Sequence, residues 1–225
     1  MEFQLAKDVA EATRIQNELH GKIRIEPLKK EPKTIAGADI SYNRFSDDFF
    51  ACVVVLSLPE LEIVEAVFAK GIATFPYVPG YLSFREIPTL LKAFEKLKTK
   101  PDVVMADGQG IAHPRRLGIA THLGITLDLP MFGCAKHKLF GVGRAPLATR
   151  GSVSLLHDPK TDETIGALVR TKDNVAPVII SPGHKITLEE SIELTLRTAK
   201  GYRIPEPTRR AHELVNKFRR GEIYA

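Results

Sequence analysis

The residue most able to do chemistry in this chain is Asp107, which ends an apolar run and precedes two glycines. The run is Val103–Ala106, and Gly108 and Gly110 follow the acid. Such a run is typical of a buried strand in a parallel or mixed sheet, and in open α/β sheets ligands bind at the carboxyl ends of the strands. The alternative is that Asp107 only begins a turn, because Asp-Gly is a common turn pair.

A second acid, Asp39, lies inside the predicted strand 34–42. A carboxylate within an apolar strand is costly unless it is paired, hydrogen-bonded or bound to metal, and the alternative is a strand-end side chain turned to solvent. If this strand pairs with 103–107, the two acids come from neighbours about 4.8 Å apart and repel each other unless a cation lies between them. Oxygen ligands select a hard ion, Mg²⁺ or Mn²⁺, which can activate water in phosphoryl transfer.

A third acid, Glu86, falls in the predicted helix 83–98, at the edge of its apolar face. The same spacing predicts that Arg85 and Thr89 face outward. The alternative role for Glu86 is structural, because Ser83 and Glu86 fit the spacing of a helix capping box. A helix starting there would hold Pro88 in its interior, at the cost of a backbone hydrogen bond.

The elements that must position these acids follow from hydrophobic periodicity and from helix and turn signals. The acids fall within a pattern of three strands, helix, strand, helix and strand, followed by further strands and helices. The first three strands form an antiparallel meander. Beyond the segments already named, the sequence predicts helix 8–20 capped by Asp8, strands 49–58 and 61–71, helix 114–124, strand 129–135, a short strand 153–156, paired strands 163–171 and 176–181, helix 187–198 with a Thr187–Glu190 capping box, and helix 207–220 with Pro207 in its first turn.

Length and composition indicate an ordinary globular protein. The 225 residues predict one domain, 1–225, and 44% of them are hydrophobic. We see no membrane span and no signal peptide, and the two cysteines lack metal-ligand spacing, so we expect a cytoplasmic protein with reduced thiols. The net charge of +5 suits a polyanionic partner but is shared by many enzymes. The loop, elbow and helix motifs of P-loop, α/β-hydrolase and zinc-protease chemistry are absent.

Six short motifs, in order along nearly the whole chain, resemble the endonuclease V family. They are Gly37–Ser41, Phe75–Gly80, Phe84–Glu86, Asp107–Gly110, His113–Arg115 and Glu206–Arg209. The resemblance implies an RNase H-like α/β fold: a mixed five-stranded central sheet flanked by helices, with additional C-terminal strands and helices. It also implies a Mg²⁺-dependent DNA repair endonuclease, for which Mn²⁺ can substitute. Such an enzyme hydrolyses the second phosphodiester bond 3′ to a deaminated base, chiefly inosine, and leaves a 3′-hydroxyl and a 5′-phosphate.

The resemblance also assigns catalytic roles. Asp39 and Asp107 would hold the metal, with Glu86 contacting it or its water, and the remaining catalytic residues would be His212 and Lys136. Without the resemblance, His212 reads as a helix-edge histidine near Val215. Lys136 alone reads as a solvated lysine at a strand end.

Nucleic-acid contacts follow from the same resemblance. The loop Pro76–Pro79 would be a wedge that separates strands, although two prolines also suit an ordinary rigid connection. The predicted DNA-binding residues are Tyr77, Pro79, Arg85 and His113, and the predicted pocket for an extruded base is formed by Gly80, Leu82, Gly108 and Ile119.

Three other functions remain open at this point. The chain could be an inosine-directed ribonuclease, since eukaryotic relatives favour inosine in RNA. It could be another RNase H-like nuclease, such as a junction resolvase, or a non-catalytic nucleic-acid-binding protein. We expect a monomer whose partner is DNA containing deaminated bases, with RNA as the alternative, and no membrane association.

Overall fold

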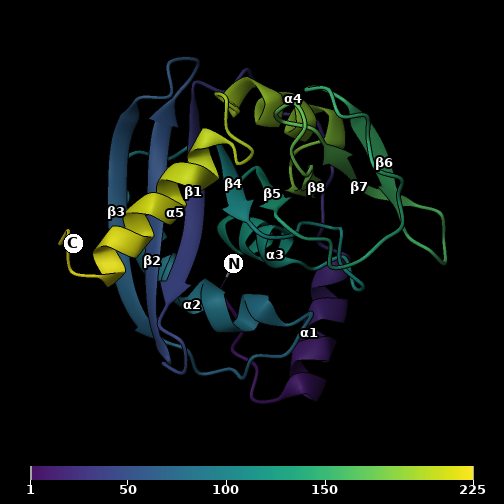
Figure 1. Cartoon of the computed structure of the whole chain (residues 1–225). Helices are drawn as coiled ribbons and strands as arrows, with labels where there is room; N and C mark the ends of the chain where they lie inside the picture. The colour runs from purple at the N-terminus through teal and green to yellow at the C-terminus, as the bar shows by residue number, and fades with distance from the viewer. Residues whose placement is uncertain (1, 225) are drawn as a thin grey trace.

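The chain folds around one eight-stranded sheet in the order β3-β2-β1-β4-β5-β8-β7-β6 (Figure 1). The structure, a computed structural model, describes residues 2–224. Its strands are β1 Thr34–Tyr42, β2 Asp48–Ser57, β3 Ile63–Ile72, β4 Val103–Asp107, β5 Met131–Ala135, β6 Val153–His157, β7 Thr164–Val169 and β8 Val178–His184. Its helices are α1 Val9–His20, α2 Leu82–Phe94, α3 Ile119–Leu127, α4 Leu188–Thr198 and α5 Glu206–Arg219.

The sheet is mixed, and its parallel part lies at the centre. β1, β2 and β3 form the predicted antiparallel meander, while β4 pairs parallel with both β1 and β5. The C-terminal strands β8, β7 and β6 continue the same sheet antiparallel to β5, where the sequence suggested additions to a five-stranded core. The carboxyl ends of β1, β4 and β5 therefore meet at one edge.

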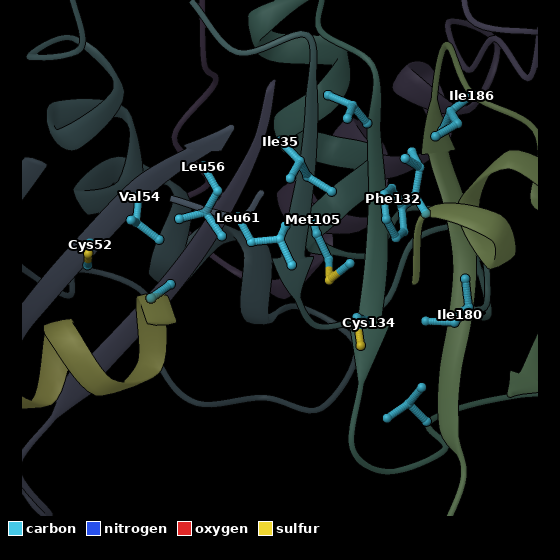
Figure 2. Close-up of a cluster of buried hydrophobic side chains, with 14 of the residues drawn as sticks. Ile35, Cys52, Val54, Leu56, Leu61, Met105, Phe132, Cys134, Ile180 and Ile186 are labelled. Atoms are coloured by element: carbon cyan, nitrogen blue, oxygen red, sulfur yellow. The ribbon is translucent and has the colours of Figure 1, made fainter. Parts of the chain in front are cut away.

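Side chains alternate between the two faces of the central strands, and each face has its own helices. Ile35, Met105 and Phe132 point to the face covered by α4 and α5 (Figure 2). Their neighbours in sequence, such as Ala36 and Val104, point to the face covered by α2 and α3. In Figure 1, α5 runs obliquely across β1 and β2. Each large apolar side chain buried in these layers stabilises the fold by about 1.5–3 kcal/mol.

Helix α2 departs from the predicted pattern at its start. Its N-cap position is Tyr81 and no side chain caps it, so the alternative role of Glu86 in a capping box with Ser83 does not hold. The Ser83 hydroxyl instead lies 3.1 Å from Nδ1 of His122 in α3. Pro88 lies inside the helix, as a start at this point requires.

The outward orientation predicted for two α2 residues is also wrong. Thr89 is 1% exposed and packs on β3, where a Cβ added to Gly71 would lie 2.3 Å from its Oγ1. The Arg85 guanidinium lies 4.9 Å from the centre of the Phe49 ring and donates to the Phe75 carbonyl at 2.8 Å. The reason is that β2 and β3 both pack against α2 and cover these two positions.

Other boundaries agree with the sequence or shift by a few residues. The Asp8 cap of α1 and the Thr187–Glu190 capping box of α4 are confirmed. Helix α3 begins at Ile119 rather than at residue 114, because a turn with Arg116 at φ 60° comes first. That turn is held by ion pairs from Arg116 to Asp158 at 2.6 Å and to Glu163 at 2.7 Å.

Helix α1 packs beside the sheet rather than on it. Its buried apolar residues join Phe75, Phe84, Leu117 and Ile125 in a cluster of their own. Both cysteines are free and buried, as predicted. Within residues 2–224, no helix combines the length and apolar character needed to cross a bilayer.

Candidate active site

Asp39 and Asp107 lie side by side at the carboxyl ends of adjacent parallel strands. Ala38 of β1 pairs with Ala106 of β4, so the next residue on each strand is one of the two acids. Both side chains point to the α5 face, because each lies an even number of residues from the inward-facing Ile35 or Met105. The predicted juxtaposition of the two acids is confirmed.

Helix α5 lies on this face at close range because β1 has a glycine there. A Cβ added to Gly37 would stand 1.8 Å from the Pro207 carbonyl oxygen of α5. Farther along, His212 Nδ1 lies 2.8 Å from Asp39 Oδ2, and the Ser41 hydroxyl donates to Asn216 Oδ1 at 2.9 Å. Two residues of a strand and four residues of a helix each advance about 6–7 Å. Every second residue of β1 on this face therefore meets the next turn of α5.

One ligand atom from each of Asp39, Asp107 and His212 lies within 4.8 Å of the others. Glu86 approaches from α2 on the opposite face and stays outside this tight group. It is 9% exposed. Burial raises its pKa well above the usual value, and the charges of Asp39 and Asp107 raise it further. The three acids therefore share one electrostatic environment, although only two of them belong to the tight group.

Cationic side chains offset part of the negative charge. Lys136, at the end of β5, places Nζ 2.5 Å from Asp107 Oδ2. Burial alone would lower the pKa of Lys136, but the charge and hydrogen bond of Asp107 outweigh it, and the net shift is upward. The hydrogen bond to Asp39 likewise raises the pKa of His212. Burial, the largest effect, raises the pKa of Asp39 despite its hydrogen bond with His212.

The donor set suits a hard divalent cation. Carboxylate oxygens are the ligands that Mg²⁺ and Mn²⁺ prefer, and Asp39 and Asp107 supply them here. The raised pKa values of Asp39 and Glu86 show that burial and mutual repulsion disfavour their ionised forms. Positive charge placed among them would reverse both shifts, so the residues present fit a metal.

A pocket of about 410 Å³ opens beside these acids. All four residues predicted to surround an extruded base line it: Gly80, Leu82, Gly108 and Ile119. Tyr77, Asp107 and Lys136 line it as well. Gly108 has φ +150°, and a Cβ there would lie 2.5 Å from Ile119 Cγ2, so only glycine leaves this wall in place.

Comparison with known proteins identifies the family. A sequence profile of Endonuclease V matches residues 17–213. An Endonuclease V of Dictyoglomus turgidum is 46% identical over 222 residues, which cover 99% of this chain and 96% of that protein. The chain belongs to the Endonuclease V family. It is therefore a nuclease, and so a hydrolase.

Solved structures of the family share the whole fold. The crystal structure of Endonuclease V from Streptomyces avermitilis has a TM-score of 0.90 at 37% identity and covers 96% of this chain and 95% of its own. The catalytic domain of human Endonuclease V has a TM-score of 0.88 at 31% identity, with 95% and 96% covered. The fold is thus RNase H-like, as predicted. Endonuclease V of Ciona intestinalis, in complex with a 24mer DNA containing an inosine followed by a ribo-adenosine, has a TM-score of 0.84 at 28% identity, with 97% and 100% covered.

The four residues predicted to touch DNA occupy different environments in this Endonuclease V. Tyr77 is 67% exposed, so it is not part of the core beneath its loop, and Pro79 follows it in the same loop. His113 is 2% exposed, with one ring nitrogen on the Gly80 carbonyl and the other on the Arg115 amide. Arg85 is held against Phe49 and Phe75. Neither His113 nor Arg85 presents a free surface group.

Some residues that support the site were given no role in the sequence analysis. Arg203 donates to the Lys136 carbonyl at 2.7 Å and also to carbonyls of Ala176 and Pro177. Gln109 donates to the His137 carbonyl at 2.8 Å. Only Asn216 could have been found, because it stands four residues after His212, on the same side of a predicted helix.

Proposed function

We propose that this Endonuclease V is a Mg²⁺-dependent DNA repair enzyme that hydrolyses the second phosphodiester bond 3′ to inosine and other deaminated bases, leaving a 3′-hydroxyl and a 5′-phosphate. The observation that carries the proposal is the pocket between the exposed Tyr77 and the group of Asp39, Asp107 and His212. The pocket that would recognise a base therefore adjoins the acidic group that would hydrolyse a nearby bond. The inosine-containing DNA bound by the relative from Ciona intestinalis supports the substrate class.

The cation would be held by Asp39 and Asp107, with Glu86 contacting it directly or through water. When bound, Mg²⁺ supplies activation of water and stabilisation of the leaving oxygen, and Mn²⁺ can replace it. The raised pKa values of Asp39 and Glu86 support this assignment, because a buried group of acids gains stability from a counter-charge.

His212 is oriented to exchange a proton. With the Nδ1 proton donated to Asp39, Nε2 is left as the acceptor on a side chain that is 57% exposed. Asn216 fixes the ring, since its Nδ2 lies 3.3 Å from Nε2 and its Oδ1 is held by Ser41. Lys136 presents an ammonium group at the rim of the pocket, where a phosphate oxygen could pair with it.

The wedge residue and the pocket would share the work of base extrusion. Removing a base from the stack costs a few kcal/mol. An aromatic ring that fills the gap returns part of this cost, since stacking on a base contributes about 1–3 kcal/mol. Tyr77 is exposed on a loop with prolines on both sides, so the ring is available without a large loss of conformational entropy.

The test is cleavage of end-labelled duplexes with and without a single inosine, in DNA and in RNA, with Mg²⁺, with Mn²⁺ and with EDTA. We expect cation-dependent nicking of inosine DNA at the second 3′ bond, and little cleavage of the undamaged strand. Equal cleavage of the inosine-containing and the undamaged substrates would overturn the lesion specificity. Nicking in EDTA would overturn the metal requirement. Preference for the RNA strand would instead assign an inosine-directed ribonuclease.

A further inference from the structure

The carbonyl oxygen of Gly80 accepts hydrogen bonds from three side chains. Gln16 Nε2 lies 3.0 Å away, His113 Nε2 2.9 Å and Arg115 Nη2 3.1 Å. A backbone carbonyl has two lone pairs and commonly has one or two partners. Gly80 is also a wall of the base pocket and lies three residues after Tyr77, so this oxygen is the point at which the wedge loop is fastened.

The donors hold one another as well as the carbonyl. The Arg115 amide donates to Nδ1 of His113 at 3.1 Å, which fixes the tautomer with the proton on Nε2, facing Gly80. Burial lowers the pKa of His113 to about 4, so the ring stays neutral at physiological pH. Arg115 Nε donates to the Gln16 side-chain oxygen, which turns the Gln16 amide nitrogen toward Gly80.

Helix α1 supplies one of the three donors, Gln16, and a second contact to the loop through Thr13. Gln16 is fully buried although it is polar, and its neighbours on the helix face pack against Phe75 and Phe84, which flank the wedge loop. One turn earlier, the Thr13 hydroxyl lies 2.8 Å from the Tyr81 hydroxyl. The Arg115 guanidinium lies 4.3 Å from the centre of the same tyrosine ring.

Gly80 itself is shaped for this contact. Its φ of +83° lies in the left-handed region, and a Cβ there would stand 3.2 Å from Arg115 Nη2. The turn that contains Gly80 is closed by a hydrogen bond from the Tyr81 amide to the Val78 carbonyl at 3.0 Å. The loop therefore has a rigid base at residues 78–81 and an exposed ring at Tyr77.

We propose that Gln16, His113 and Arg115 are positioning residues that clamp the Gly80 carbonyl, so that α1 sets the height of the Tyr77 wedge and the shape of the base pocket. Helix α1 thereby serves base recognition, while hydrolysis depends on the other side of the pocket. The inference rests on the proposed role of the loop in recognising inosine, and its first test below does not depend on that role.

The first test measures the loop directly. The chain contains no tryptophan, so Tyr77→Trp places a single indole on the wedge, which can be excited selectively over the remaining tyrosines. We expect Gln16→Met in this background to raise the mobility of the introduced indole, measured as a lower residual anisotropy in its time-resolved decay. The matched control is Asn17→Met, which changes the next amide of α1 at an exposed position. Unchanged anisotropy in a folded Gln16→Met protein would overturn the clamp.

The second test separates recognition from hydrolysis. With Tyr77 present, we expect Gln16→Met to raise the Kd for an inosine-containing duplex about tenfold. The single-turnover rate at saturating enzyme should stay within about threefold, because the clamp does not touch the reacting atoms. A variant that merely lost fold would lower the active fraction on every substrate alike. Equal Kd values for Gln16→Met and Asn17→Met, with the wedge fluorophore loosened, would overturn the link between α1 and recognition.

A milder pair of variants guards against loss of folding. Thr13→Val and Tyr81→Phe each remove one hydroxyl of the same hydrogen bond, and we expect each to raise Kd about threefold without an added loss in the double variant. Losses that multiply in the double variant would show that the two hydroxyls act separately, and would overturn their place in the clamp. If even the parent does not cleave inosine duplexes, the proposed function fails, and the anisotropy measurement still decides the clamp.

Discussion

Gly37 of β1 lies directly beneath the Pro207 carbonyl of α5, so close that a Cβ would stand 1.8 Å from the oxygen. No side chain other than hydrogen fits at this point. The contact sets the separation between the helix and the sheet, and five residues later the same helix brings His212 to Asp39 at 2.8 Å. The height of α5 above the sheet, and with it the approach of His212 to Asp39, therefore depends on one residue that carries no functional group.

Gly37→Ala should push α5 outward and cost cleavage activity. Overpacking of this kind costs about 1–3 kcal/mol of stability, and we expect at least a tenfold loss of single-turnover rate as His212 withdraws from Asp39. The control is Gly21→Ala at the end of α1, where a Cβ meets nothing within 4 Å. The melting temperature and the single-turnover cleavage rate are measured on both variants. A Gly37→Ala enzyme that cleaves at the parental rate would contradict the packing argument.

Asp107→Ala should abolish cleavage while substrate binding stays largely intact. The loss of an anion removes a metal ligand and also lessens repulsion with phosphate. Single-turnover cleavage and fluorescence anisotropy of a labelled inosine duplex measure the two effects separately. A rate within about tenfold of the parent, or ~1.4 kcal/mol of barrier, would show that the metal assignment is wrong.

Glu86→Gln should abolish activity without lowering stability. The side chain caps no helix, and its buried carboxyl is disfavoured in the ionised form by burial and by the charges of Asp39 and Asp107. An uncharged amide removes this repulsion, so we expect an unchanged or raised melting temperature together with lost cleavage. Lost stability with retained turnover would assign Glu86 a structural role.

Tyr77→Ala should weaken recognition of inosine in a duplex more than in a single strand. The inosine of a single strand has no pairing partner to leave, so the Tyr77 ring should contribute less to binding there. Because the ring is 67% exposed, we expect little change in melting temperature. Kd values for duplex and single-stranded inosine substrates give the comparison, and equal losses on both would count against the wedge.

Acid should destabilise the protein through His122. Burial lowers the pKa of His122 to about 3, while the unfolded chain titrates near 6.5, so the unfolded state binds a proton that the folded state excludes. The stability contributed by the neutral ring is fully present above pH 6.5 and is lost as the pH falls toward 3, about 2 kcal/mol at pH 5. Urea unfolding at pH 7.5 and pH 5 should show a smaller difference in His122→Gln than in the parent. The exposed His20→Gln serves as the control.

The sequence predicted the acids at the sheet edge because burial and strand order are local signals. The apolar run before Asp107 and the cost of a carboxylate within 34–42 both indicated strands, and parallel pairing of those strands brought Asp39 beside Asp107. The same signals could not show that β8, β7 and β6 continue the central sheet, since they join it through the pairing of β8 with β5, two strands separated by residues 136–177.

Errors arose where a residue's environment is set by contacts distant in sequence. Thr89 follows the helical period of a solvent face, but β3 covers that face. The DNA contact predicted for His113 stays a prediction, and nothing in the sequence indicated that its ring is buried with hydrogen bonds to Gly80 and Arg115. Gly80, His113 and Arg115 lie in motifs of the family, but the part that Gln16 takes in the clamp had no signal, because nothing local distinguishes it from any other glutamine on an amphipathic helix.

The pairing of Asp39 with His212 joins residues 173 positions apart. A chain emerging from the ribosome carries Asp39, Glu86 and Asp107 long before the last helix is made, and until then it lacks the histidine that faces them. With the proton-exchange role that we propose for His212, nuclease activity would begin only after the final helix has docked on the first strand. An unfinished chain would then hold its three acids without the ability to cut nucleic acid.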